Sequence, residues 1–139
     1  MRKAVLIFLT IVLASGLAQA QKTDTTSMRV FHFVVKNTDW QSMGVPGSAG
    51  YYMAYHYPCS AVTKNVFNHG FVDVQILGTS GGGWYPLPHT YYTGATEQAI
   101  TFNYNPGYIE LRLYGASGKP SDMAGIDEYK LVIIPEPVK

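Results

Sequence analysis

Short runs of apolar, β-branched and aromatic residues recur along the chain, separated by Gly, Pro, Asn and Ser. Runs of this kind, bounded by turn residues, are typical of β-strands. The segment 63–68 alone reads as a short helix, with Thr63 as its N-cap and Gly70 as a left-handed stop. The pattern predicts about seven strands, at residues 29–36, 50–57, 71–77, 83–88, 97–104, 107–114 and 128–134.

The strongest strand pattern spans residues 100–113. Apolar residues alternate with polar ones before and after the turn, so one face of each strand should be buried while the other meets water. Pro106 presets a negative φ and Gly107 accepts a positive φ, which together fit a type II turn. The last run, 129–134, is apolar on both faces after Lys130, and this predicts a central or covered strand.

Many short strands with regular turn signals predict an all-β domain. We expect a two-sheet antiparallel β-sandwich, immunoglobulin-like or jelly-roll-like, with a small barrel as the alternative. The sequence divides into a signal peptide at 1–20, a flexible lead-in at 21–28 and a single sandwich domain at 29–139.

The first twenty residues have the pattern of a secretory signal peptide. A basic start is followed by the uncharged apolar run 4–14, and Ala18-Gln19-Ala20 supplies the small residues that a signal peptidase accepts. A permanent membrane anchor is the alternative, but spanning a bilayer takes about 20 apolar residues. Gln21 stands where a lipoprotein would carry Cys. We therefore expect cleavage after Ala20, and a secreted, periplasmic or extracellular protein without stable membrane insertion.

Charge and cysteine usage narrow the functional classes. Without Arg2 and Lys3 the chain has 8 Lys and Arg against 9 Asp and Glu, scattered singly. A nucleic-acid partner is not expected, because such binding depends on clustered cations that neutralise phosphates. Cys59 is the only cysteine, so the fold has no internal disulfide. Cys59 is expected to be a small buried hydrophobe, with an intermolecular disulfide or a reactive thiol as the alternative.

One segment matches the sequence pattern of a catalytic motif but lacks the structural context that the motif needs. Residues 78–82 read Gly-Thr-Ser-Gly-Gly and match the G-x-S-x-G pattern around Ser80. A hydrolase elbow needs a helix after the serine, whereas Gly83-Trp84-Tyr85-Pro86 follows here. We interpret the segment as a flexible hairpin loop and assign no catalytic residue.

No metal or cofactor is predicted either. The four histidines lack the spacing that places two imidazoles on one face, although distant ones could still converge on zinc. His32 and His56 are expected to be partly buried and hydrogen-bonded, and Glu110 with Arg112 to form a surface ion pair. Acidic residues around the loop 115–126 loosely resemble a calcium loop but lack its D-x-D-x-D-G run. These acidic residues are Asp122, Asp127 and Glu128.

Aromatic residues provide the candidate binding surface. Alternation should turn Trp84 and Tyr85 to opposite faces, and Trp84 is expected in the core because its burial removes more apolar area from water. This leaves Tyr85, His89, Tyr91 and Tyr92 as the predicted ligand-binding residues, on which a sugar ring or a protein segment could dock. The alternative is that most of these rings belong to the core.

A set of positions also carries a family resemblance. Trp40, Tyr51-Tyr52, a Val62-Thr63 segment running to Gly70, Trp84 with Leu87-Pro88, and Phe102 with Pro106-Gly107 follow one another in order. Over about 40–134 this order resembles an uncharacterised family of small secreted bacterial domains. The resemblance implies export and a β-rich domain, and it supplies neither an activity nor site residues.

These observations favour an exported, non-enzymatic binding or interaction module of the cell envelope or extracellular space. Its partner would be carbohydrate or another envelope protein. The alternative from another class is a small secreted hydrolase or metal-dependent enzyme, which convergent His and Asp residues beside a cleft would indicate. A purely structural subunit is the third possibility, and a long unpaired apolar edge strand would indicate it.

Overall fold

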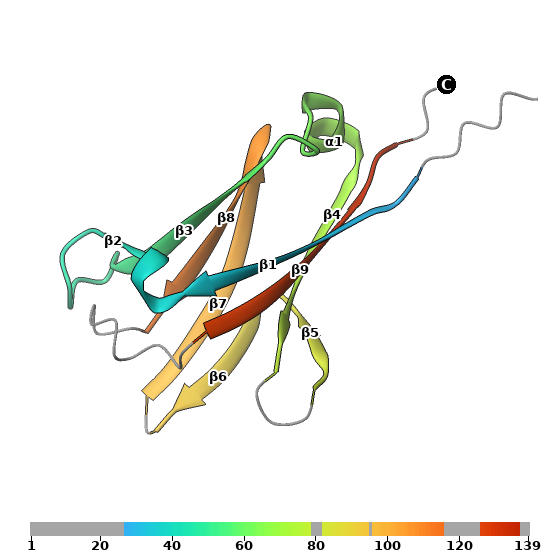
Figure 1. Cartoon of the computed structure of the whole chain (residues 1–139). Helices are drawn as coiled ribbons and strands as arrows, with labels where there is room; N and C mark the ends of the chain where they lie inside the picture. The colour runs from blue at the N-terminus through green and yellow to red at the C-terminus, as the bar shows by residue number, and fades with distance from the viewer. Residues whose placement is uncertain (1–26, 79–81, 95, 116–125, 137–139) are drawn as a thin grey trace, which may run out of the picture.

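Two antiparallel β-sheets pack face to face in the computed structural model, which describes residues 27–78, 82–94, 96–115 and 126–136 (Figure 1). One sheet has the strand order β1-β9-β4-β5 and the other has the order β2-β3-β8-β7-β6. The strands are β1 (Arg29–Lys36), β2 (Gln41–Met43), β3 (Tyr52–Cys59), β4 (Phe71–Leu77), β5 (Trp84–Pro86), β6 (His89–Thr93), β7 (Thr96–Asn105), β8 (Gly107–Tyr114) and β9 (Ile126–Ile134). Two short helical segments are also present, η1 (Asn37–Asp39) and α1 (Lys64–His69).

The predicted all-β sandwich is confirmed. Strands β1, β4 and β8 have the predicted bounds, and β9 lies between β1 and β4 as its two apolar faces indicated. Two strands were missed. β2 is too short to show alternation, and β6 at 89–93 follows directly after the expected strand at 83–88, of which only Trp84–Pro86 forms a strand, β5; β6 belongs to the other sheet. The signal peptide, most of the lead-in and Asp122 lie outside the described residues.

The core forms from the inward positions of both sheets. Alternation along β8 buries Ile109, Leu111 and Leu113 completely, and β9 contributes Leu131 and Ile133 in the same way. Period-two alternation explains this, because every second side chain of a strand points to the same face. Cys59 is 5% exposed and belongs to this core, so its predicted role as a buried hydrophobe is confirmed.

The β7–β8 turn follows its sequence signature. Gly107 has a φ of +96°, as the type II turn requires, and Asn105 pairs with Tyr108 across it. The backbone N–H of Gly107 also donates to the carbonyl of Val62 at 2.8 Å. The turn is therefore fixed both by its own geometry and by a bond to the segment before α1.

Helix α1 begins as predicted and ends differently. The hydroxyl of Thr63 accepts from the N–H of Val66 at 3.2 Å, which is an N-cap contact. The left-handed stop at Gly70 is wrong, because Gly70 has a φ of −85°. Glycine is favoured here because there is no room for a side chain. A Cβ at position 70 would lie 2.9 Å from the Val66 Cα and 3.0 Å from the Ile134 carbonyl oxygen.

The β4–β5 connection is a hairpin in which the N–H of Gly78 donates to the carbonyl of Gly83 at 2.9 Å. Ser80, the centre of the G-x-S-x-G pattern, lies outside the described residues. Within the part of the chain that is described, no helix has the length and apolar character needed to cross a bilayer.

Candidate functional site

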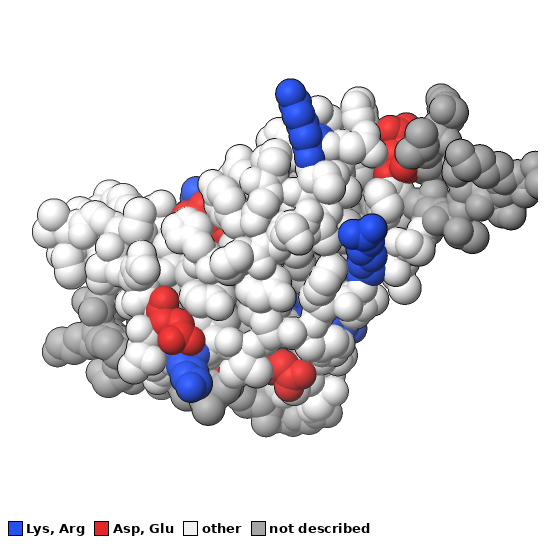
Figure 2. All heavy atoms as spheres, turned by 45° about the horizontal axis from the view of Figure 1, so that its top comes forward, with Lys and Arg blue, Asp and Glu red and all other residues white. Residues whose placement is uncertain are grey.

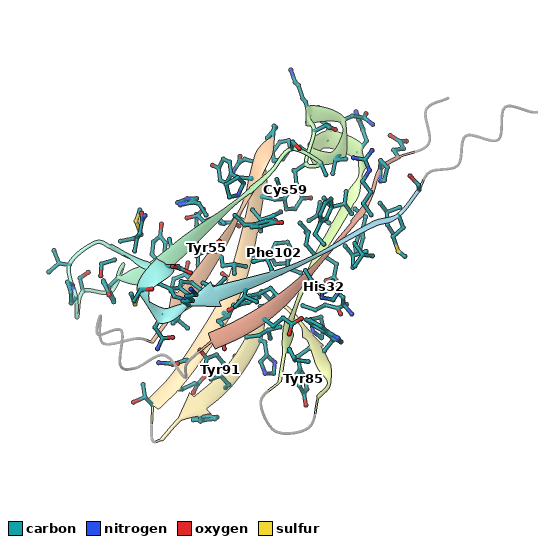
Figure 3. The ribbon with its side chains drawn as sticks, viewed as in Figure 1. His32, Tyr55, Cys59, Tyr85, Tyr91 and Phe102 are labelled. Atoms are coloured by element: carbon teal, nitrogen blue, oxygen red, sulfur yellow. The ribbon has the colours of Figure 1, made fainter. Side chains whose placement is uncertain are left out.

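Three of the predicted binding residues meet where the chain crosses between the sheets. Tyr85 on β5 stacks on His89 of β6 with ring centroids 5.0 Å apart, and His89 is followed by Tyr91 at 6.4 Å. Tyr85 is 44% exposed, whereas Tyr91 packs against the core. Figure 3 shows Tyr85 and Tyr91 at the same end of the sandwich. We call this row of rings the corner.

Tyr92 and Trp84 lie elsewhere. Tyr92 is 69% exposed on the opposite side of β6, where its hydroxyl donates to Glu97 at 3.3 Å. The expectation that Trp84 is core is wrong. It is half-buried on the outer face of the four-stranded sheet, with the Lys130 ammonium 4.6 Å from its ring centroid. The indole gains this cation–π contact while the smaller side chain of Leu87 fills the core position nearby.

The outer face of the five-stranded sheet carries a larger group of aromatic residues. Its residues alternate with the inward core positions of β3, β6 and β8, so they project to the side away from the other sheet. We call this surface the tyrosine face. Its aromatic residues are Tyr52, His56, Tyr92, Tyr108 and Tyr114.

A buried carboxylate lies at the centre of the tyrosine face. Glu110 of β8 is only 7% exposed although its strand position faces outward. It accepts a hydrogen bond from Arg112 at 3.0 Å, and the imidazole of His56 lies 3.9 Å away. The predicted ion pair therefore exists, but it is not a solvated surface pair as expected. A largely buried charge is retained only when it is well partnered.

Arg112 is held in place from several directions. Besides Glu110, the Asn103 side-chain oxygen, in the orientation that satisfies its neighbours, accepts from Arg112 Nη2 at 2.9 Å. The guanidinium carbon lies 5.1 Å from the ring centroid of Tyr52. The hydrogen bond to Glu110 raises the pKa of Arg112 further above its usual value. The guanidinium is thus a fixed cation whose charge Glu110 cancels.

The remaining rings frame this polar centre. Tyr52 lies next to Tyr114, with centroids 5.5 Å apart, and Tyr108 contacts His56 edge to face at 5.6 Å. Along β8 the order is Tyr108, Glu110, Arg112 and Tyr114. Tyr114 lies six positions after Tyr108, and six steps along a strand correspond to about 20 Å. The face therefore offers a ring at each end of a hydrogen-bonding pair.

A second polar group lies inside the sandwich, behind the corner. Burial raises the pKa of Tyr91 to about 12, and the nearby Asp127 carboxylate adds to this rise. Burial also raises the pKa of Asp127, which the Tyr129 hydroxyl opposes. That hydroxyl is fully buried and makes no hydrogen bond of regular geometry, so its contact with Asp127 is weak. The three groups share one poorly solvated region.

The histidines do not converge. His32 lies 3.5 Å from Glu128, His69 lies 3.7 Å from Glu136, and His56 lies beside Glu110 on the tyrosine face. The side chains of His32 and His56, expected to be partly buried, are 53% and 47% exposed, so about half of each is covered. Among the described residues, no group of three His, Cys, Asp or Glu side chains is placed to hold a metal ion.

The sequence contained part of the signal for the tyrosine face. Tyr108, Glu110, Arg112 and Tyr114 have the same parity along one strand, so period two already places them on one face. The contribution of His56 depends on the pairing of β3 with β8, which brings His56 opposite Glu110. Strand order between distant segments cannot be read from alternation alone.

No protein-family model matches this chain, and neither curated proteins nor solved structures give a match. The resemblance to small secreted bacterial domains therefore stays a prediction.

Proposed function

We propose that this protein is an exported, non-enzymatic binding module that recognises a neutral glycan through the tyrosine face. The observation that carries the proposal is the placement of Glu110, a largely buried carboxylate that fixes Arg112 between aromatic rings on an outward sheet surface. A burial of this kind costs free energy unless the group is well paired. The pairing of Glu110 with Arg112 produces a rigid set of hydrogen-bonding groups at the surface.

The chemistry of this face suits a sugar chain. Tyrosine rings provide flat apolar area with little loss of side-chain entropy on binding. Sugar hydroxyls can bond to the exposed Asn103 amide and accept from the Arg112 guanidinium, which Glu110 holds in place from a buried position. Because the charges of Glu110 and Arg112 cancel, the face favours a neutral ligand over an anionic one. Figure 2 shows charged side chains scattered over the visible surface, without a large patch of one sign.

Export is proposed from the first twenty residues, whose basic start, apolar run and Ala18-Gln19-Ala20 ending fit a signal peptide. The enzyme alternative has less support. Three histidines each lie beside a different carboxylate, in three separate places, and the proposal assigns them no shared chemistry.

The test is direct binding of the exported protein to insoluble cellulose, chitin and xylan and to a glycan array. We expect Tyr108→Ala and Tyr114→Ala to weaken binding by about tenfold each, since each removes ring contact worth about 1 kcal/mol or more. Tyr85→Ala, at the corner, is the matched control and should keep wild-type affinity. Failure of the wild-type protein to bind any of these glycans would contradict the proposal.

The corner is a second candidate site, favoured by the exposed Tyr85 ring stacked on His89. Its rings already cover part of each other's faces by stacking, and Tyr91 packs against the core. A corner ligand would therefore be a short apolar protein segment rather than a sugar chain. If Tyr85→Ala removed binding while Tyr108→Ala did not, the ligand site would be the corner.

A further inference from the structure

Strand β1 is the longest strand at the edge of either sheet (Figure 1). It has 8 residues, whereas the other edge strands β2, β5 and β6 have 3, 3 and 5. In the described part of the chain β1 pairs with β9 alone, so the backbone groups along its other side have no strand partner. An unpaired edge of this length is a template for a strand from another chain.

The usual protections of an edge are missing from β1. Short length protects β2, and proline lies within β5 and directly before β6. Between its two end residues β1 has neither Pro nor Gly, and His32 is its only polar residue. On its outward face Val30 and Val34 are 45% and 50% exposed. The strand therefore offers both free backbone groups and apolar side chains.

We propose that β1 pairs antiparallel with β1 of a second copy of this chain, with the two His32 residues opposite each other at a two-fold axis. Strand addition at an edge is a common mode of protein association, and a two-fold interface must be complementary to itself. In this register Val30 faces the partner's Val34 and Phe31 faces the partner's Phe33. Each apolar residue of the edge thus meets an apolar residue on the same face.

Charge supports this register. Full overlap of the two strands would place Arg29 opposite Lys36, and it would also set inward residues against outward ones, which sheet pairing does not allow. Shifting the pairing by one residue removes both problems. Arg29 then lies opposite the partner's Val35, and Lys36 opposite the partner's Met28. No two cations face each other along the pairing.

The assembly would join two four-stranded sheets into one continuous sheet. β1 belongs to the four-stranded sheet. The pairing of two β1 strands therefore leaves the tyrosine face, on the five-stranded sheet of each copy, uncovered. Two ligand faces on one particle would raise the apparent affinity for a repeating ligand such as a polysaccharide. The pairing itself does not depend on what the tyrosine face binds.

The first test is sedimentation of the exported protein, which should behave as a dimer at micromolar concentration. Val34→Lys places a cation in the pairing and should raise the dimer dissociation constant at least tenfold, while the circular dichroism spectrum keeps its β signal because Val34 is exposed in the single chain. Val45→Lys makes the same chemical change at a residue that is 71% exposed in the β2–β3 loop, and it should remain dimeric. A wild-type monomer at high micromolar concentration would overturn the proposal, as would a Val34→Lys dimer of undiminished affinity.

The second test addresses the register. Opposed residues of an antiparallel pair have Cα atoms about 4.5–5.5 Å apart, which a disulfide can span. His32→Cys should therefore cross-link two copies under mild oxidation, since the native Cys59 is buried. Val34→Cys lies opposite Val30 rather than itself and should cross-link far more slowly. The opposite result, with rapid linkage at 34 and none at 32, would refute the register.

Discussion

The rings of Tyr85 and His89 stack with their centroids 5.0 Å apart, and this contact joins the edge strands of two different sheets. Three residues separate them in sequence, and Leu87 in the middle is 6% exposed with its N–H donating to the Val74 carbonyl at 2.8 Å. The crossing is therefore held by the buried Leu87 and, at the solvent-exposed rim between the sheets, by the ring pair. Gly78 completes the arrangement, because a Cβ there would overlap the Tyr85 ring.

This relationship can be tested by NMR. Replacing Tyr85 by Ala should move the ring protons of His89 downfield, since they lose the shielding of a stacked aromatic ring. Gly78→Ala should do the same by displacing the Tyr85 ring, at little cost in stability because a flexible side chain can move aside. Tyr92→Ala, on the opposite side of β6, is the control and should leave the His89 shifts unchanged. Unaltered His89 shifts in Tyr85→Ala would disprove the stacking.

The β7–β8 turn makes a stability prediction. Gly107→Val forces a β-branched residue into a φ of +96°, and we expect the free energy of unfolding to fall by about 1–3 kcal/mol. Urea unfolding measures this. Gly50→Val is the matched control, because Gly50 has no positive φ and no atom lies within 4 Å of a Cβ built there. Equal stability of both variants would show that Gly107 does not need its left-handed conformation.

The fold was predictable because alternation and turn chemistry act locally. Period two identifies β4 and β8 to the residue, and Pro106-Gly107 specifies the type of the β7–β8 turn by backbone sterics alone. The failures involve contacts between segments distant in sequence. Trp84 is held outside the core by Lys130 of β9, and Glu110 is buried by His56 and Arg112 together. Such placements depend on strand order and register, which one strand's pattern does not contain.

The ion pair at the centre of the tyrosine face should contribute measurably to stability. Glu110→Ala leaves Arg112 without its main partner in a half-buried position, and the free energy of unfolding should fall by about 1–3 kcal/mol. The control is Glu136→Ala, which removes an exposed partner of His69 and should change stability by less than about 1 kcal/mol. If the two variants were equally stable, Glu110 would be an ordinary surface carboxylate.

Cys59 provides a chemical test of the core. Its side chain is buried among apolar residues, so a thiol reagent should react with it only when the protein opens. We expect labelling in native buffer to be slower than labelling in denaturant by orders of magnitude, with complete reaction in denaturant. Fast native labelling, or a disulfide-linked dimer in the purified wild-type protein, would contradict this burial.

The interior carboxylate predicts how stability depends on pH. Burial raises the pKa of Asp127 above its usual value of 3.8, with weak opposition from the Tyr129 hydroxyl. The folded state therefore holds this proton more tightly than the unfolded state does. The stabilisation of the folded state by this tighter proton binding is fully present below pH 3.8, and it is lost as the pH rises through the folded-state pKa of Asp127. At pH 7 the ionised carboxylate should thus lower the free energy of unfolding.

Asp127→Asn removes this titration with little change in shape. Urea unfolding from pH 3 to pH 7 should show the variant gaining stability relative to the wild type as pH rises, with the difference levelling off near neutrality. The informative quantity is the difference in the free energy of unfolding between the two proteins, because the other carboxylates change the stability of both equally with pH. Tyr129→Phe is the companion variant: removing the hydroxyl that opposes the rise should make the loss of stability extend to higher pH. A constant difference between wild type and Asp127→Asn at every pH would mean that burial does not shift this group.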